Sequence, residues 1–240
     1  MTFASLTTVT ISGVDASIAL DDLLTLSREF PFVEWGVLLS QAAGAHPKYP
    51  DHDWVDGLCH FARSNAMALS GHVCGAWTRE LLSGAWPQPL QRFFFNRLQL
   101  NISTMPAEAI QPERWIPLLA PGCEIIVQFN HLKPRFDPVT LVKKLERANH
   151  AASVLFDASG GRGIETKAWP APLDLPKMGY AGGLHPHNIR AQLAQLMLVT
   201  AGNPCTLWID MESGVRTTDG LHLDLARVRR CLEVAAGFVR

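Results

Sequence analysis

Three features that would point to membranes, secretion or nucleic acid are missing from this sequence. No window contains the roughly 18 consecutive apolar residues that a membrane-spanning helix needs. The opening MTFASLTTVTISGVD lacks the basic segment followed by an apolar one that marks a secretory leader. The formal net charge of −1 provides no basic footprint for nucleic acid. We therefore expect a cytoplasmic protein that binds neither membranes nor nucleic acid.

Cysteine is scarce and shows no pairing pattern. The five cysteines contain no C-x-x-C motif, and an odd number cannot all pair within one chain. We expect reduced and mostly buried thiols, as is usual in the cytoplasm. These residues are Cys59, Cys74, Cys123, Cys205 and Cys231.

Histidine is more frequent, but its spacing does not suit a metal. His185 and His187 lie two residues apart, so they do not share one face of a helix, and no third ligand follows at zinc spacing. We expect no metal and no other cofactor.

The chain does contain ample material for a core. Hydrophobic residues make up 48% and charged residues 18% of the 240 residues, and no polar linker divides the sequence. Eight short runs rich in β-branched or aromatic residues predict strands. They cover residues 7–12, 32–40, 66–73, 97–103, 124–130, 152–159, 177–182 and 206–211.

Segments with apolar residues at helical spacing separate these runs. Asp137 followed by Pro138 is typical of a helix start, and Asp53 predicts another start before WVDGLCHF. A strand followed by a helix, eight times over, predicts an α/β fold, a single-domain (βα)8 TIM barrel over residues 1–240. An open doubly wound sheet is the alternative.

Residues that end the predicted strands are the candidates for function, because the active sites of such barrels lie at the carboxyl ends of the strands. Polar side chains at these positions can contact a ligand, and we expect Asn101 and Asp210 to do so. The full set is Ser12, Ser40, His72, Asn101, Asn130, Asp157, Gly182 with Gly183, and Asp210 through Gly214.

Two glycine-bearing motifs follow the last two strands. AGGLHPHN contains Gly182 and Gly183, and DMESGV contains Ser213 and Gly214. Their backbone amides could bind an anion, since glycine lets the backbone approach its oxygens closely. The alternative is that the glycines only form tight turns. Their position after strands seven and eight favours a phosphate site.

Asp157 ends the sixth strand and precedes a glycine-rich loop, in VLFDASGGRG. A carboxylate at the mouth of a barrel can serve as a general acid or a general base. It can also simply cap the amides of the following turn. Arg162 in the same loop could contact an anionic ligand or remain solvated.

Five of these motifs, taken in order, resemble a known family. VTISGV, RLQLNIS, VLFDASGGRG, AGGLHPHNI and DMESGV are similar to the strand-end motifs of phosphoribosylanthranilate isomerase, a barrel enzyme of tryptophan biosynthesis that performs an Amadori rearrangement. The resemblance implies that Asp157 is the general acid that protonates the ribose ring oxygen. It also implies a phosphate site at Gly182, Gly183, Ser213 and Gly214.

The sequence departs from this family at two positions. The resemblance puts the family's general base, a cysteine, at Ser12, and its substrate-binding arginine at Lys48. A thiol is about 3% ionised at pH 7, whereas a serine hydroxyl has essentially no anion without a partner base. Lysine replaces a planar fork suited to a carboxylate by a point charge. Glu212 adds a negative charge near the phosphate site, although Arg216 could offset it.

His72 and His131 end the third and fifth strands, so either could supply the missing base. The alternative is that each is only hydrogen-bonded. A barrel lyase or epimerase could use them, but we see neither a strand-end lysine for a Schiff base nor an obvious pair of carboxylates.

We therefore expect a barrel that binds a small phosphorylated, sugar-type molecule and acts as an aldose–ketose isomerase, with Asp157 and Ser12 or His72 in the catalytic site. A non-catalytic ligand-binding barrel is the alternative. Turnover of phosphoribosylanthranilate should be weak, Ser12→Cys should raise it and Asp157→Asn should abolish it. The sequence leaves a homodimer, the true substrate and the pathway open.

Overall fold

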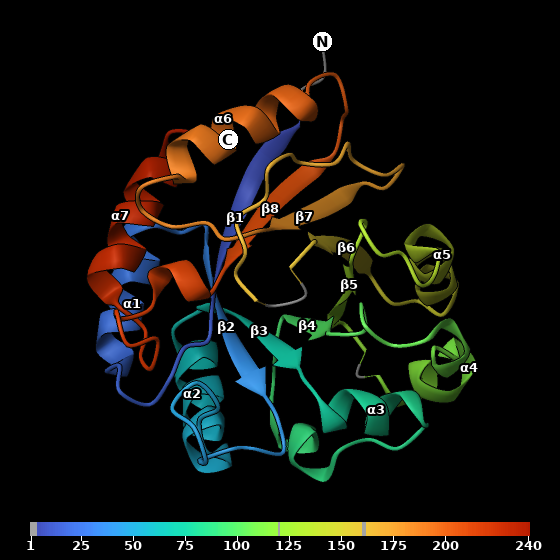
Figure 1. Ribbon diagram of the computed structural model, residues 1–240. Coiled ribbons are helices and arrows are strands. Elements are labelled where there is room, and N and C mark those ends of the chain that lie inside the picture. Colours follow the sequence, from blue (N-terminus) through green and yellow to red (C-terminus); the bar gives the residue numbers. More distant parts are fainter. Residues whose placement is uncertain (1–3, 120, 160–161) are drawn as a thin grey trace.

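A computed structural model describes residues 4–119, 121–159 and 162–240. Eight parallel strands pair in sequence order, and β8 pairs with β1, so the sheet closes into a barrel (Figure 1). The predicted (βα)8 barrel is confirmed and the open sheet is wrong. The strands are β1 (Ser5–Ser12), β2 (Val33–Leu39), β3 (Ala68–Val73), β4 (Arg97–Leu100), β5 (Glu124–Phe129), β6 (Ala152–Asp157), β7 (Lys177–Ala181) and β8 (Thr206–Met211).

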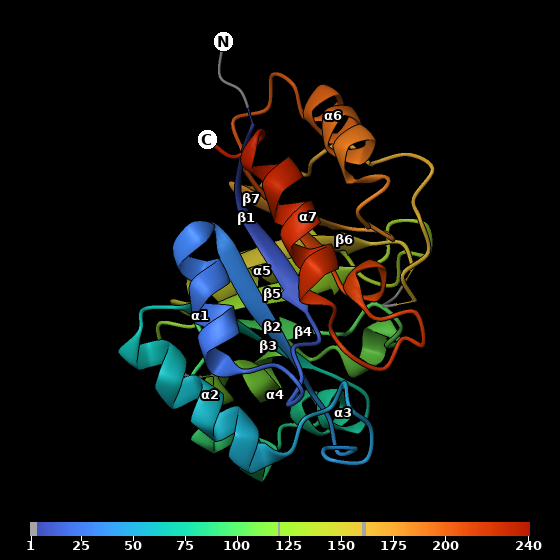
Figure 2. The same cartoon turned by 90° about the vertical axis from the view of Figure 1, so that its left-hand side faces the viewer.

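Helices surround the barrel, as the two perpendicular views in Figures 1 and 2 show. Within the described ranges, none of them is long and apolar enough to cross a membrane. The α-helices are α1 (Leu20–Glu29), α2 (His52–Ser64), α3 (Ala76–Leu82), α4 (Pro112–Trp115), α5 (Pro138–Arg147), α6 (Ile189–Val199) and α7 (Leu225–Ala236). Short 3-10 helices are η1 (Gln88–Arg92), η2 (Ala107–Ala109), η3 (Ile116–Leu118) and η4 (Ser213–Val215).

One of the two predicted helix starts is confirmed. The carboxylate of Asp137 accepts hydrogen bonds from the amides of Val139 and Thr140 at the start of α5. Asp53 is not a cap, because α2 begins earlier and Asp51 accepts the hydrogen bond from the amide of Trp54. Both aspartates precede the same apolar run, and the sequence pattern alone did not separate them.

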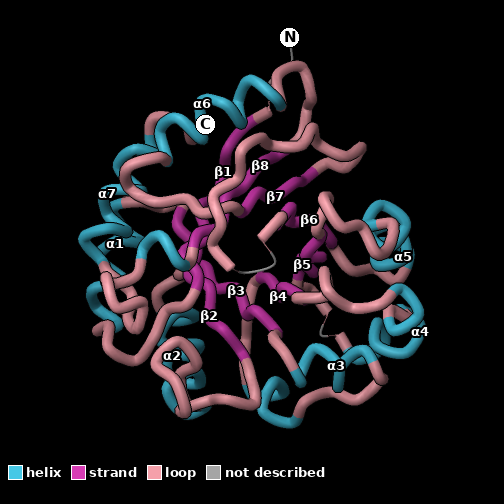
Figure 3. Tube along the Cα trace, in the orientation of Figure 1, coloured by secondary structure: helices cyan, strands magenta, loops and turns pink. Residues whose placement is uncertain are grey.

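The predicted repeat of strand and helix fails once, after β6. The described residues between β6 and β7 contain no helix and form a loop (Figure 3). Pro170, Pro172 and Pro176 explain this, because proline lacks the amide hydrogen that a helix interior needs. Trp169 is buried and donates through its indole nitrogen to the carbonyl of Gln192 in α6, at 3.0 Å. The loop thus covers this side of the barrel in place of a helix.

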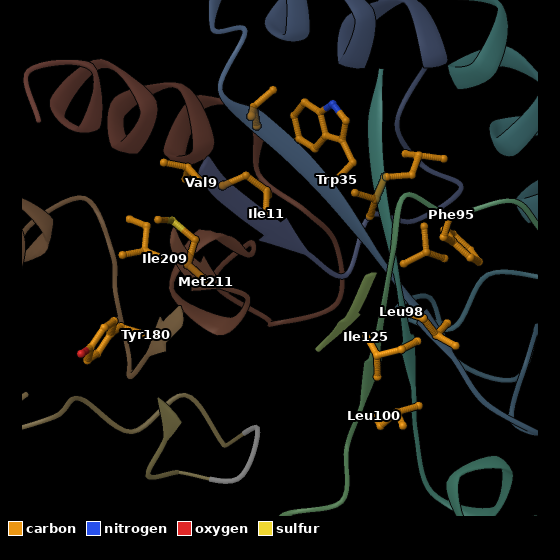
Figure 4. Packing of buried hydrophobic residues seen from close by; sticks show 14 of the residues in the cluster. Val9, Ile11, Trp35, Phe95, Leu98, Leu100, Ile125, Tyr180, Ile209 and Met211 are labelled. Carbon is orange, nitrogen blue, oxygen red and sulfur yellow. The ribbon is translucent and has the colours of Figure 1, made fainter. Parts of the chain in front are cut away.

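The main core lies between the strands and the helices. Outward-facing side chains such as Ile11, Trp35, Leu100 and Ile209 fill this layer (Figure 4), and all four are fully or almost fully buried. Burying one such side chain contributes about 1.5–3 kcal/mol. The alternation of outward apolar and inward polar residues in β1 and β3 therefore aims the polar ones into the barrel.

The inside of the barrel near the amino ends of the strands is charged. Arg97 in β4 donates through Nε and Nη2 to the two carboxylate oxygens of Glu34 in β2, at 2.7 and 2.6 Å. Its guanidinium lies 4.6 Å from the ring centroid of Trp208, and Glu124 pairs with Lys177 at 2.6 Å. Above this ionic layer, a small separate cluster of Ile126, Leu155 and Trp208 fills the middle of the barrel.

Candidate functional site

A cavity opens at the carboxyl ends of the strands, where the chemistry of such barrels takes place. Its described lining combines polar side chains from the strand ends with the backbone of the loops that follow β6, β7 and β8. The predicted site residues that line it are Ser12, His72, Asn101, Asp157, Gly182, Gly183, Asp210, Ser213 and Gly214.

Ser12 and Asp210 form one unit on the adjacent strands β1 and β8. The Ser12 hydroxyl donates to Asp210 Oδ1 at 2.6 Å, and both side chains are buried. Burial raises the pKa of Asp210 to about 7; the Ser12 hydrogen bond acts against this, and the negative charges of Glu212 and Asp157 add to it. A carboxyl with a pKa near neutrality can both accept and donate a proton at physiological pH.

Asp157, at the end of β6, is held from two sides. Gln128 in β5 donates through Nε2 to Asp157 Oδ2 at 2.7 Å, and Ser159 donates its amide and hydroxyl to Oδ1 at 3.0 and 2.8 Å. Ser103 donates to the other end of the Gln128 amide at 3.0 Å, which fixes its orientation. Asp157 therefore caps the turn that follows it and also lines the cavity, so the capping role and a catalytic role are compatible. Gly160 and Gly161 of the predicted glycine-rich loop lie outside the described residues.

His72 also faces the cavity, from β3. Its Nε2 lies 3.1 Å from the Ser70 hydroxyl, and burial lowers its pKa to about 4, so the ring is neutral at pH 7. Gly36 leaves the space between the two candidate bases. A Cβ at this position would lie 2.7 Å from Ser12 Oγ and 3.0 Å from His72 Nε2.

His131, the other candidate histidine, is absent from the described lining of the cavity. Its ring contacts Phe156, with the ring centroids 5.4 Å apart. Phe156 alternates with the inward-facing Leu155 and Asp157 along β6, so it points outward from the barrel. The geometry therefore does not favour His131 as a base.

Two amide side chains, from β4 and the residue just after it, contribute to the lining. Gln99 donates through Nε2 to Asn101 Oδ1 at 2.8 Å, and Asn101 Nδ2 lies 3.0 Å from the sulfur of Cys74. Burial raises the pKa of the Cys74 thiol to about 12, so it stays protonated at neutral pH. Gln99 is buried, and its Oε1 has no hydrogen-bond partner among the described residues.

The glycines in the loops after β7 and β8 allow these loops to pack closely against neighbouring backbone. Gly183 has a positive φ of 62°, and a Cβ there would lie 2.5 Å from the backbone nitrogen of Glu165. A Cβ at Gly214 would overlap with the carbonyl of Leu184. These glycines are therefore required by the close packing of the loops. Anion binding is compatible with it, because within the described ranges the amides of Gly183, Leu184 and Gly214 have no hydrogen-bond acceptor.

The predicted cationic residues lie apart from the lining. Lys48 lies in the loop after β2 with its ammonium 5.0 Å from the ring centroid of Tyr49. Arg162 is exposed and donates through Nε to the carbonyl of Ser159 at 2.8 Å. Neither is among the residues that line the cavity.

Glu212 does line the cavity, and its contacts lie on the β1 side. Its carboxylate is 4.0 Å from Arg216 Nε, and its Cγ lies close to Gly13. Burial raises the pKa of Glu212, and the positive charges of Arg216 and Lys48 act against this. The Glu212 carboxylate is therefore directed toward Arg216 and does not fill the proposed anion site at the Gly183 amide.

Sequence reasoning missed Gln99, Gln128 and the meeting of several carboxyl groups in one cavity. The available signal was a glutamine in the middle of two strands whose other residues are mostly apolar. In the part of the chain that the structure describes, no three His, Cys, Asp or Glu residues are arranged to hold a metal ion.

Comparisons with known proteins agree with this architecture. The family model for N-(5'-phosphoribosyl)anthranilate (PRA) isomerase matches residues 107–234. Comparison with curated proteins found no significant match.

Among solved structures, phospho-2-dehydro-3-deoxyheptonate aldolase (DAHP synthase) from Thermotoga maritima is similar, with 11% identity, a TM-score of 0.54, and coverage of 96% of this chain and 68% of that chain. Thiamine phosphate pyrophosphorylase from Pyrococcus furiosus is similar with 11% identity, a TM-score of 0.53 and coverage of 98% of both chains. Identities this low show the shared fold alone.

Proposed function

Because the chain belongs to the N-(5'-phosphoribosyl)anthranilate isomerase family, we propose that its barrel mouth binds a small phosphorylated sugar-type ligand and catalyses an aldose–ketose isomerisation. One observation carries the catalytic part of this proposal. The hydrogen-bonded pair of Ser12 and Asp210 shares a cavity with Asp157, so two carboxyl groups are available to a single ligand. The replacement of a base cysteine by Ser12 is then compensated by its partner.

The reaction needs one group that gives a proton and one that takes a proton. Asp157, the counterpart of the family's general acid, protonates the ring oxygen as the ring C–O bond breaks. Asp210 removes the proton from C2, and Ser12 holds the carboxylate in place by donating to it. Asp210 then delivers its proton to C1, and Asp157 regains one from the C2 hydroxyl. Both carboxyl groups end as they began, and the aldose has become a ketose.

The loops after β7 and β8 support a site for the phosphate. Gly183, Leu184 and Gly214 are lining residues, and within the described ranges their backbone amides make no hydrogen bond to the protein. Amides of this kind can donate to phosphate oxygens without a cationic side chain. Ser213 adds a hydroxyl to the same part of the lining.

Substitution of either carboxyl group tests the assignment. We expect Asp157→Asn and Asp210→Asn each to lower kcat by about 10²- to 10⁴-fold, since each removes one proton-transfer step. Ser12→Cys should raise the weak turnover of phosphoribosylanthranilate, because it restores the family's base. The measurement is ketose formation from ribose 5-phosphate and from phosphoribosylanthranilate.

Asp22→Asn provides the matched control, because Asp22 is exposed on α1. It should leave turnover unchanged. If wild-type turnover is substantial and Asp210→Asn does not reduce it, the assignment of Asp210 is wrong.

The pH dependence of kcat/KM distinguishes Asp210 from His72 as the base. A base acts when it has lost its proton, so activity should rise as the pH passes through the pKa of this residue. With Asp210 the rise is expected near pH 7, and with His72 near pH 4. A profile that is already flat between pH 5.5 and 8.5, at roughly one-unit resolution, would exclude Asp210.

A non-catalytic ligand-binding barrel is the second candidate, favoured by Ser12 in the position of the family's base. It predicts that ribose 5-phosphate binds with the same affinity to the wild-type protein and to Asp210→Asn, and that neither protein forms a product. Binding and turnover measured on the same protein preparations therefore separate the two functions.

A further inference from the structure

The described lining of the cavity is rich in carboxyl groups. Three carboxyl groups line it, those of Asp157, Asp210 and Glu212, and no lysine or arginine is among the described lining residues. Glu212 and Asp157 are among the causes that raise the pKa of Asp210. The three carboxyl groups therefore already influence one another before any ligand enters.

Cations close to the cavity are already engaged with protein groups. The guanidinium of Arg97 is bound to Glu34 below the mouth, and Arg216 donates to the carbonyls of Gly13 and Leu221 at 2.8 and 3.0 Å while its Nε lies 4.0 Å from Glu212. Lys48 lies over the ring of Tyr49, outside the lining. None of the three forms the planar fork that pairs with a ligand carboxylate in two hydrogen bonds.

The same lining offers hydrogen-bond acceptors. Gln99, a residue of the lining, is 4% exposed, and its Nε2 donates to Asn101 Oδ1, which leaves Oε1 buried without a partner among the described residues. A buried acceptor without a donor is unfavourable, so this oxygen calls for an O–H or N–H group. The carboxylate of Asp210, also in the lining, likewise accepts and does not donate when ionised.

We infer, resting on the proposed function, that the phosphorylated ligand enters the barrel with an end that carries hydroxyl or amine groups and no carboxylate, and that Gln99 Oε1 accepts a hydrogen bond from this end. A ligand carboxylate would add negative charge beside the three carboxyl groups of the lining, with no lysine or arginine among the described lining residues to receive it. Hydroxyl and amine hydrogens instead satisfy the acceptors that are present. The specificity of this barrel thus differs from that for an anthranilate, whose ring bears a carboxylate.

A matched pair of ligands tests this inference by isothermal titration calorimetry. Both are reduced product analogues, a 1-amino-1-deoxypentitol 5-phosphate whose nitrogen bears either a phenyl or a 2-carboxyphenyl group. We expect the phenyl compound to bind at least about tenfold more tightly, which corresponds to about 1.4 kcal/mol. Glu212→Gln, which removes one carboxyl group from the lining, should reduce the difference in affinity between the two compounds.

A variant of the acceptor provides the second arm. Gln99→Leu should weaken ribose 5-phosphate binding by about tenfold, whereas Gln99→Glu retains an acceptor oxygen. Gln91→Leu, at an exposed glutamine of η1, is the control for a general effect of the substitution. Circular dichroism verifies that each variant is folded.

The possible outcomes separate the two proposals. Equal or tighter binding of the carboxyphenyl compound, or unchanged binding by Gln99→Leu, would overturn the inference and leave the phosphorylated ligand intact. If none of the phosphorylated compounds binds while the protein is folded, the proposed function itself fails.

Discussion

Replacement of Arg97 by methionine is expected to lower the free energy of unfolding by about 3–5 kcal/mol, the usual cost of removing one partner of a buried ion pair. Arg97 and Glu34 are 4% and 3% exposed, and they share two hydrogen bonds inside the barrel. Without the guanidinium, the carboxylate of Glu34 remains buried, and among the described residues only the hydroxyl of Thr10 still donates a hydrogen bond to it. Urea denaturation followed by circular dichroism measures the loss.

Two further variants keep this prediction decisive. The double variant Glu34→Leu with Arg97→Met should recover most of the stability, because apolar side chains can replace a buried pair as a unit. Arg92→Met removes a surface pairing with Asp53 and Asp56 and should have no measurable effect. If Arg97→Met lowers the free energy of unfolding no more than Arg92→Met does, the ion pair of Arg97 and Glu34 does not stabilise the barrel.

The effect of Asp210→Asn on the free energy of unfolding, relative to wild type, is expected to be more favourable at alkaline pH than at acid pH. The folded protein holds the Asp210 proton up to about pH 7, while the unfolded chain releases it near 3.8. Between these values, raising the pH therefore weakens the wild-type fold, by at most about 4 kcal/mol in total. Asparagine does not titrate, so the variant lacks this decline.

The measurement is the difference in unfolding free energy between Asp210→Asn and wild type, at pH 4 and at pH 8. Comparing the variant with wild type at each pH cancels the contribution of all other titrating groups that the substitution leaves unchanged. We expect the difference to shift in favour of the variant as the pH rises. A difference that is the same at both pH values would show that Asp210 ionises in the fold as readily as in the unfolded chain.

The strands and their ends were within reach of the sequence because they depend on local patterns. Runs of β-branched and aromatic residues predict all eight strands, and the carboxyl ends of parallel strands must meet at one mouth. The loop after β6 was mispredicted as a strand-to-helix repeat, although Pro170, Pro172 and Pro176 gave a readable signal against a helix.

Contacts across the barrel were out of reach for a different reason. Ser12 and Asp210 lie 198 positions apart, and their hydrogen bond exists only because β1 and β8 close the barrel. Sequence analysis therefore considered Ser12 without its partner. Glu34 and Arg97 were also overlooked, although a charge within a strand that is otherwise buried indicates that an opposite charge must face it.

The thin apolar layer of Ile126, Leu155 and Trp208 has a consequence for how this barrel can evolve. It lies between the ionic base and the acidic mouth, and a layer of low polarity screens charge weakly. Glu34 in the base already contributes to the raised pKa of Asp210, and Glu34 with Arg97 acts on His72. A substitution of Glu34 or Arg97 that raises thermal stability would therefore also change the pKa values of Asp210 and His72. Adaptation to temperature and adaptation to a substrate are thus coupled in this barrel.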